Sequence, residues 1–142
     1  MRTPLVQTPG TVGDDAVLRE WSTACDPTPS AVALARTRTR TQLTVLGWTG
    51  DVEDAVLVVS ELVTNAVRHA YVAGHVPWLR LAVLESGGLW VDVSDAVAGF
   101  GPGAKGEEGG RGLQLVRNLG RLSWFLRAEP QCGKTVRVHL LP

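Results

Sequence analysis

The segment from residue 52 to residue 70 constrains the fold more than any other part of the chain. Its apolar residues recur at intervals of three and four positions, which places them on one face of an α-helix. Asp51 precedes the segment as a candidate N-cap. A helix with such a face has to bury it, so the sequence predicts a long amphipathic helix over a hydrophobic core. The apolar positions are Val52, Ala55, Val56, Val59, Leu62, Val63, Ala66, Val67 and Ala70.

The period changes from helical to alternating after residue 77. Leu79, Leu81 and Val83 alternate with their neighbours, which predicts a strand. A hairpin turn at 85–88 leads to a return strand at 89–94. Helices over one face of a mostly antiparallel sheet are the economical packing, so we expect an α+β fold built as a two-layer α/β sandwich. The other expected elements are strands at 19–25, 122–128 and 134–141 and helices at 30–46 and 111–119.

The length and composition fit one compact domain. The chain has 142 residues, of which 44% are hydrophobic and 20% are charged, as in a globular protein. Residues 1–15 are rich in Thr, Pro and Gly, and we interpret them as a flexible leader. The domain is therefore expected to span residues 16–142.

The charge balance and the cysteines exclude several classes of protein. The formal net charge is zero, with 14 basic and 14 acidic residues, which argues against direct nucleic-acid binding. No apolar run approaches the roughly 20 residues of a membrane span, so a cytoplasmic protein is expected. Cys25 and Cys132 form no CxxC pair or Cys/His cluster, which disfavours a zinc site. We expect two reduced thiols, with a single disulfide as the alternative.

Three polar residues follow the long helix at the edge of its apolar face. Glu61, Asn65 and His69 are spaced by four, so they share one side of the helix. An amide oxygen is a hard ligand suited to Mg²⁺. A carboxylate one turn away can orient and deprotonate a hydroxyl or water. The stripe therefore suits a phosphate-and-magnesium site, although a solvated polar edge remains the alternative.

Two further features point to a nucleotide. Asp95 ends the 89–94 strand and can accept a hydrogen bond from an amine such as that of adenine; an ordinary Asp in a turn is the alternative. Glycines at 109, 110 and 112 precede a helix, and they let backbone amides approach a phosphate closely. The run Gly133-Lys134-Thr135 leads into a strand and not a helix, which excludes a P-loop.

The order of these features resembles the Bergerat ATP-binding domain, the GHKL or histidine kinase-like ATPase fold. It is most similar to the anti-sigma-factor serine/threonine kinase branch of that superfamily. The resemblance covers about residues 20 to 141. The matching blocks are SELVTNAVRHA at 60–70, VDVSD at 91–95, GRGLQLV at 110–116 and GKTV at 133–136.

The resemblance implies a site for ATP and Mg²⁺. In it, Asn65 chelates the Mg²⁺ bound to the triphosphate, Glu61 is the general base, and Asp95 accepts the adenine amine. The backbone amides of the glycines at 110 and 112 cradle phosphate. The cofactor-binding positions implied besides Asn65 and Asp95 are His69, Gly99, Gly110, Arg111, Gly112, Leu113 and Thr135.

Some implied roles are specific to single residues. Arg111 contacts phosphate, and Thr135 helps to hold Asp95 and the adenine. Residues 96–109 form a short ATP lid that orders on nucleotide binding. The family pattern Asp-x-Gly-x-Gly is incomplete, because only Gly99 is in register after Asp95.

The implied reaction is transfer of the γ-phosphoryl group to a Ser or Thr of an anti-sigma factor antagonist. The protein partners would be that antagonist and a sigma factor, and a homodimer is expected from the resemblance only. No segment with a phosphoacceptor histidine precedes the site, so a complete sensor histidine kinase is not expected. The alternative is an ATP-binding module that sequesters a sigma factor or another regulator without phosphotransfer. A structural domain that binds no nucleotide is the third hypothesis.

Overall fold

The computed structural model describes residues 15–69, 72, 74–98, 107–127 and 133–142. The leader predicted for residues 1–15 therefore lies outside the described residues, apart from Asp15. Asp15 accepts hydrogen bonds from the amide and the hydroxyl of Ser86, at 3.0 and 2.6 Å. These contacts join the start of the described chain to the hairpin turn at 85–88.

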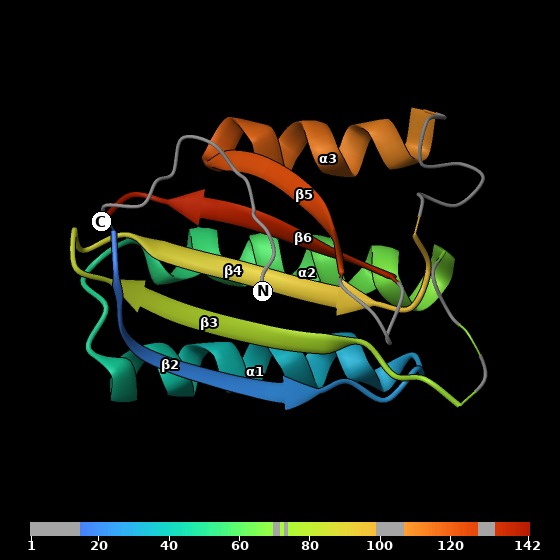
Figure 1. Ribbon diagram of the computed structural model, residues 1–142, viewed down its shortest axis with the longest axis horizontal. Helices are drawn as coiled ribbons and strands as arrows, with labels where there is room; N and C mark the ends of the chain where they lie inside the picture. The colour runs from blue at the N-terminus through green and yellow to red at the C-terminus, as the bar shows by residue number, and fades with distance from the viewer. Residues whose placement is uncertain (1–14, 70–71, 73, 99–106, 128–132) are drawn as a thin grey trace.

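Five antiparallel strands form one sheet in the order β2-β3-β4-β6-β5 (Figure 1). The central strand β4 lies between its hairpin partner β3 and the last strand, β6. The strands are β2 (Val17–Ala24), β3 (Trp78–Leu84), β4 (Leu89–Asp95), β5 (Arg121–Arg127) and β6 (Gly133–Leu140).

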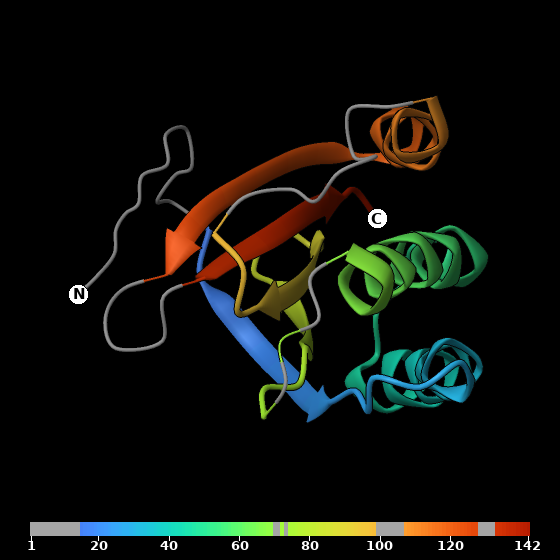
Figure 2. The ribbon, with the colours of Figure 1, turned by 90° about the vertical axis from the view of Figure 1, so that its right-hand side faces the viewer.

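Three helices lie on one face of the sheet, and Figure 2 shows the two layers edge-on. This arrangement confirms the predicted α+β sandwich. The helices are α1 (Ser30–Leu46), α2 (Val52–His69) and α3 (Glu107–Leu119). The helix predicted for 30–46 has those bounds in the structure.

The predicted apolar stripe of α2 is the centre of the core. Ala55, Val59 and Val63 are fully buried and pack in one cluster with the sheet residues Leu81 and Val91. The helix begins as expected, because the amide of residue 54 donates to the Asp51 carboxylate at 3.1 Å. The stripe thus fixes which side of α2 faces the sheet and leaves the polar edge beside it.

The bounds of α3 differ from the prediction. The sequence predicted a helix at 111–119 after a glycine-rich loop, whereas the helix begins one turn earlier, at Glu107. Gly109 and Gly110 are therefore inside the helix. Acidic residues at 107 and 108 favour a helix N-terminus through its dipole, which offsets the cost of about 1 kcal/mol for each helical glycine. Residues 99–106 of the predicted lid lie outside the described residues, and its last three residues, 107–109, belong to α3 and not to a loop.

Two other expectations concern the membrane and the thiols. In the described part of the chain, no helix is both long enough and apolar enough to cross a membrane. Cys25 is a buried, free cysteine. Cys132 lies outside the described residues.

Candidate nucleotide site

The four blocks that were singled out in the sequence meet at one end of the molecule. The last turns of α2, the end of β4, the start of β6 and the start of α3 all lie at the right-hand side of Figure 1. The strand register pairs Asp95 at the end of β4 with Lys134 at the start of β6. The fold thus brings together residues that are more than 70 positions apart in the chain.

Glu61 and Asn65 lie half-buried on α2, at the edge of the core. Glu61 faces α3, because a Cβ placed on Gly112 would lie 2.6 Å from its Oε1. Gly112 therefore leaves room for this carboxylate. The predicted base and the predicted phosphate-binding turn are neighbours in the structure.

Asp95 is buried, with a side chain only 4% exposed. The amide of Val97 donates to its Oδ1 at 2.9 Å. The Lys134 ammonium donates to Oδ1 at 3.2 Å, lies 3.0 Å from Oδ2, and donates to the Val97 carbonyl at 3.2 Å. Lys134 is equally buried. The carboxylate that was expected to read adenine is therefore held in a buried ion pair.

The charge of this carboxylate is set by two opposing effects. Burial raises the pKa of Asp95, because a charged group loses its hydration inside the protein. The Val97 amide and the Lys134 ammonium act in the opposite direction by stabilising the ionised form. Lys134 is thus the nearer of two charged side chains, with Arg127, that favour an acceptor-only carboxylate at this position.

Thr135 is not the residue beside Asp95. Its hydroxyl shares a hydrogen bond of 2.7 Å with the hydroxyl of Ser94. Side chains alternate along a strand, and Val136 of β6 is in the core with the helices. Thr135 therefore points to the helix-free face, whereas Lys134 shares the helix-covered face with Asp95. The alternation could be read from the sequence, but the pairing of β4 with β6, which puts Lys134 beside Asp95, could not.

For most of the other predicted site residues, the structure describes the backbone position but not the side chain. His69 ends α2, while Gly110 and Arg111 lie in the first two turns of α3; the side chains of His69 and Arg111 are not among those described. Leu113 is half-buried on the same helix. Gly99 lies outside the described residues.

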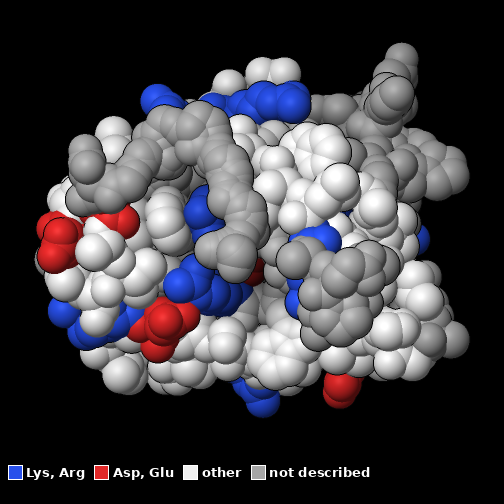
Figure 3. All heavy atoms as spheres, in the orientation of Figure 1, with Lys and Arg blue, Asp and Glu red and all other residues white. Residues whose placement is uncertain are grey.

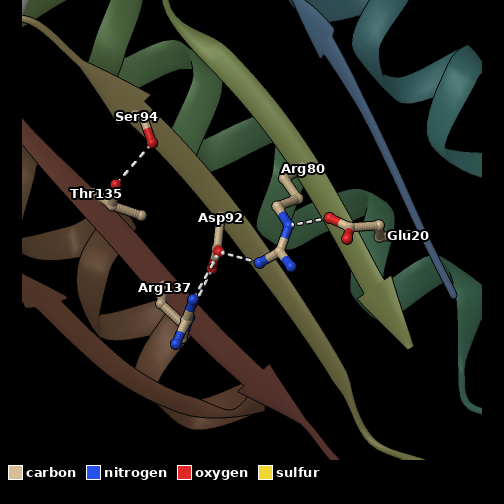
Figure 4. A network of polar contacts seen from close by, with 6 residues as sticks. All are labelled: Glu20, Arg80, Asp92, Ser94, Thr135 and Arg137. Atoms are coloured by element: carbon tan, nitrogen blue, oxygen red, sulfur yellow. Dashed lines mark hydrogen bonds and ion pairs between the residues drawn. The ribbon is translucent and has the colours of Figure 1, made fainter. Parts of the chain in front are cut away.

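The helix-free face of the sheet carries a polar network that was not predicted from the sequence (Figure 4). Asp92 is 4% exposed and accepts two hydrogen bonds of 2.9 Å from Arg137. Arg80 donates to the same carboxylate at 3.2 Å and to Glu20 at 2.6 Å. The Arg137 guanidinium also stacks 3.7 Å from the centre of the Trp90 ring.

This network joins four neighbouring strands, because its members come from β2, β3, β4 and β6. Figure 3 views the helix-free face and shows basic and acidic side chains interspersed on it. The network lies on the opposite face of the sheet from Asp95 and Lys134. We therefore assign it a structural role, which is separate from the nucleotide site.

The donor set suits a magnesium nucleotide. Mg²⁺ usually binds one or two protein oxygen ligands together with phosphate oxygens and waters, so the Asn65 amide oxygen is a sufficient protein ligand. The N-terminus of α3 offers backbone amides and a positive dipole end to a phosphate. Asp95 is a buried carboxylate at the position expected for the adenine amine, with part of its acceptor capacity occupied by Lys134. The residues present therefore fit ATP with Mg²⁺.

Comparison with solved structures shows that this fold occurs in a known protein. The chain is similar to the RsbU and RsbW domains of Rv1364c from Mycobacterium tuberculosis, with 22% identity and a TM-score of 0.62 over 87% of this chain and 32% of that one. It also matches the Erythrobacter litoralis EL346 blue-light activated histidine kinase, with 25% identity and a TM-score of 0.49 over 73% and 39%. The chain thus spans about a third of the length of the first of these proteins.

Comparison of sequences gives the family. The search of curated proteins gives no match. The family described as "Histidine kinase-like ATPase domain" matches residues 25–139, which include α2, the end of β4 and the start of β6. This match covers most of the chain and agrees with the fold. The chain belongs to the histidine kinase-like ATPase domain family.

Proposed function

We propose that this protein binds ATP with Mg²⁺ and transfers the γ-phosphoryl group to a Ser or Thr of a small regulatory protein. The acceptor would be an anti-sigma factor antagonist, and the complementary partner a sigma factor. The observation that carries the proposal is the contact between Glu61 on α2 and Gly112 on α3. It sets a carboxylate beside the second turn of α3, the helix whose N-terminal amides would hold the phosphates. The order of the four motifs supports the anti-sigma branch.

The residues of the proposed site would divide the binding of magnesium and phosphate from the transfer of the proton. Asn65 would hold Mg²⁺, which neutralises charge on the phosphates when bound. The free amides in the first turn of α3 would orient the terminal phosphate; the amide of Gly112, which was expected to do so, lies in the second turn and is used within the helix. Glu61 would accept the proton of the attacking hydroxyl, and its half-buried position keeps it within reach of the acceptor. Catalysis of phosphoryl transfer depends mostly on positioning of the reactants and on electrostatic stabilisation of the transition state.

An ATP-binding module without phosphotransfer is the second candidate. The incomplete glycine pattern after Asp95, in which only Gly99 is in register, favours it. In this case the protein would hold a sigma factor or another regulator, with nucleotide binding as the signal. Under both candidates we propose a cytoplasmic location and a homodimer.

The experiment that tests the proposal separates binding from transfer. Titration calorimetry with ATP·Mg²⁺ on wild type and Asn65→Ala should show binding only in the wild type, or at least tenfold weaker binding in the variant. Glu61→Gln should keep ATP affinity within about threefold and lose at least a hundredfold in the rate of γ-phosphate release or transfer. Equal phosphate release by Glu61→Gln would favour the second candidate. Absence of ATP binding in the wild type would reject both.

A further inference from the structure

The partners of the Lys134 ammonium are the ones that an adenine amine would need. They include the two oxygens of Asp95, at 3.2 and 3.0 Å, and the Val97 carbonyl at 3.2 Å. An ammonium and an exocyclic amine present the same kind of donor, an N–H group. The chain therefore satisfies this acceptor group with its own side chain.

The acceptor capacity of Asp95 is nearly used. An ionised carboxylate offers about four lone-pair positions on its two oxygens. The Val97 amide occupies one on Oδ1, and Lys134 lies within hydrogen-bond distance of both oxygens. Because the ammonium spans both oxygens, an incoming amine meets at most one unused position on Oδ2.

The ion pair is costly to open. Both side chains are only 4% exposed, so neither charge is hydrated when the other moves away. A neutral amine does not replace the Coulomb attraction that a full ammonium supplies at about 3 Å. Adenine recognition at Asp95 thus has to compete with an interaction that is stronger than its own.

We propose that Lys134 is a specificity-determining residue of the nucleotide site, whose ammonium competes with the exocyclic amine of adenine for Asp95. This inference rests on the proposed ATP site. Its consequence is that the wild-type protein gains little affinity from the amine. Affinity then comes mainly from the phosphates, the magnesium ligand and the stacking surface of the base.

The test compares ATP with purine riboside 5′-triphosphate, which lacks the 6-amine, by calorimetry in the presence of Mg²⁺. Wild type should bind the two nucleotides within about threefold of each other. Lys134→Met keeps the length of the side chain and removes its donors, so the carboxylate becomes available. This variant should bind ATP about tenfold more tightly than the amine-free analogue, as expected for one added hydrogen bond.

Arg137→Met is the matched control. It removes a cation from an equally buried carboxylate, Asp92, on the same strand but on the opposite face of the sheet. It should leave the ratio of the two affinities at the wild-type value. The wild-type comparison needs no variant, so it tests the inference even if Lys134→Met fails to fold.

The possible outcomes separate the inference from the proposed function. If wild type prefers ATP over the analogue by tenfold or more, Lys134 does not compete with the amine and the inference is wrong, while the ATP site stands. An unchanged ratio in folded Lys134→Met leads to the same conclusion. If neither nucleotide binds to wild type or to Lys134→Met, the proposed function itself is rejected.

Discussion

At the scale of single residues, the Asp95–Lys134 pair has a consequence for stability as well as for binding. Asp95→Asn leaves the buried Lys134 ammonium opposite a neutral amide. We expect this change to lower the free energy of unfolding by about 3 kcal/mol or more, the usual cost of leaving a buried charge without its partner. Urea denaturation followed by circular dichroism measures it.

The double variant Asp95→Asn/Lys134→Met is the control for this prediction. It removes both charges, so it should recover a large part of the stability lost in the single variant. A loss below about 0.5 kcal/mol for Asp95→Asn alone would mean that the ammonium finds other partners. A nucleotide-binding defect of Asp95→Asn should therefore be interpreted only beside its measured stability.

His139 links stability to pH. Burial lowers its pKa, assisted by Arg121 and Arg137 and opposed by Asp15, and its Nε2 has no hydrogen-bond partner among the described residues. The unfolded chain protonates this residue near pH 6.5, whereas the folded chain resists protonation. The unfolded state therefore binds more protons below that pH, and stability that is full above pH 6.5 is lost as the pH falls.

We expect wild type to lose more stability than His139→Gln between pH 7.5 and pH 5.5. The difference is at most about 1.4 kcal/mol for each pH unit below 6.5. Urea denaturation at the two pH values measures it. His75→Gln is the control, because it removes an exposed histidine in place of a buried one. Parallel pH profiles for wild type and His139→Gln would contradict the prediction.

At the scale of elements, two glycines at the site tolerate a methyl group differently. A Cβ on Gly133, the first residue of β6, would collide with the backbone carbonyl oxygen of Asp95. A Cβ on Gly112 would meet only the end of the Glu61 side chain, which can rotate. The first contact is between two strands of a sheet, and the second is between a helix and a flexible side chain.

Gly133→Ala should therefore cost about 2 to 3 kcal/mol of stability, because β4 and β6 have to separate at their ends. Gly112→Ala should cost less than about 1 kcal/mol. It should instead slow phosphate release, because it displaces the Glu61 carboxylate. Thermal unfolding and a phosphate-release assay on both variants measure this contrast. Similar stability losses in the two variants would show that Glu61 is held rigidly.

Elements were predictable from the sequence where periodicity is strong. The apolar spacing of α2 and the alternation in β3 and β4 located these elements, because burial of one face dictates both patterns. The start of α3 was not predicted, since glycines at 109 and 110 weaken the helical signal and tertiary packing decides. Similarly, the sequence does not state that β4 pairs with β6, and this pairing creates the contact between Asp95 and Lys134.

At the scale of the whole molecule, the fold gathers the site from distant parts of the chain. Glu61, Asn65 and Asp95 could be proposed as site residues from the sequence, because each lies in a motif with a recognisable order. Lys134 and the Asp92 network were missed, because their roles depend on which strands are neighbours and which face each side chain takes. A single sequence gives the alternation within a strand but not the partner strand.

A ligand that contacts α2, α3 and the ends of β4 and β6 together should stabilise the entire domain. Binding to the folded state alone adds about 2.7 kcal/mol at a ligand concentration of 100 times Kd. We expect ATP with Mg²⁺ to raise Tm by several degrees in wild type, and ATP with EDTA to raise it much less. Differential scanning fluorimetry measures both shifts.

Asn65→Ala separates the contribution of magnesium from that of the fold. Asn65 is half-buried on the polar edge of α2, outside the apolar stripe, so its removal should change the Tm of the unliganded protein by no more than a few degrees. The same variant should lose the magnesium-dependent part of the ATP shift. Thr64→Ala, one position away on the same helix, should retain it. An equal magnesium-dependent shift in wild type and Asn65→Ala would show that the metal is held by other groups. Glu61 would then be the next candidate for the magnesium ligand.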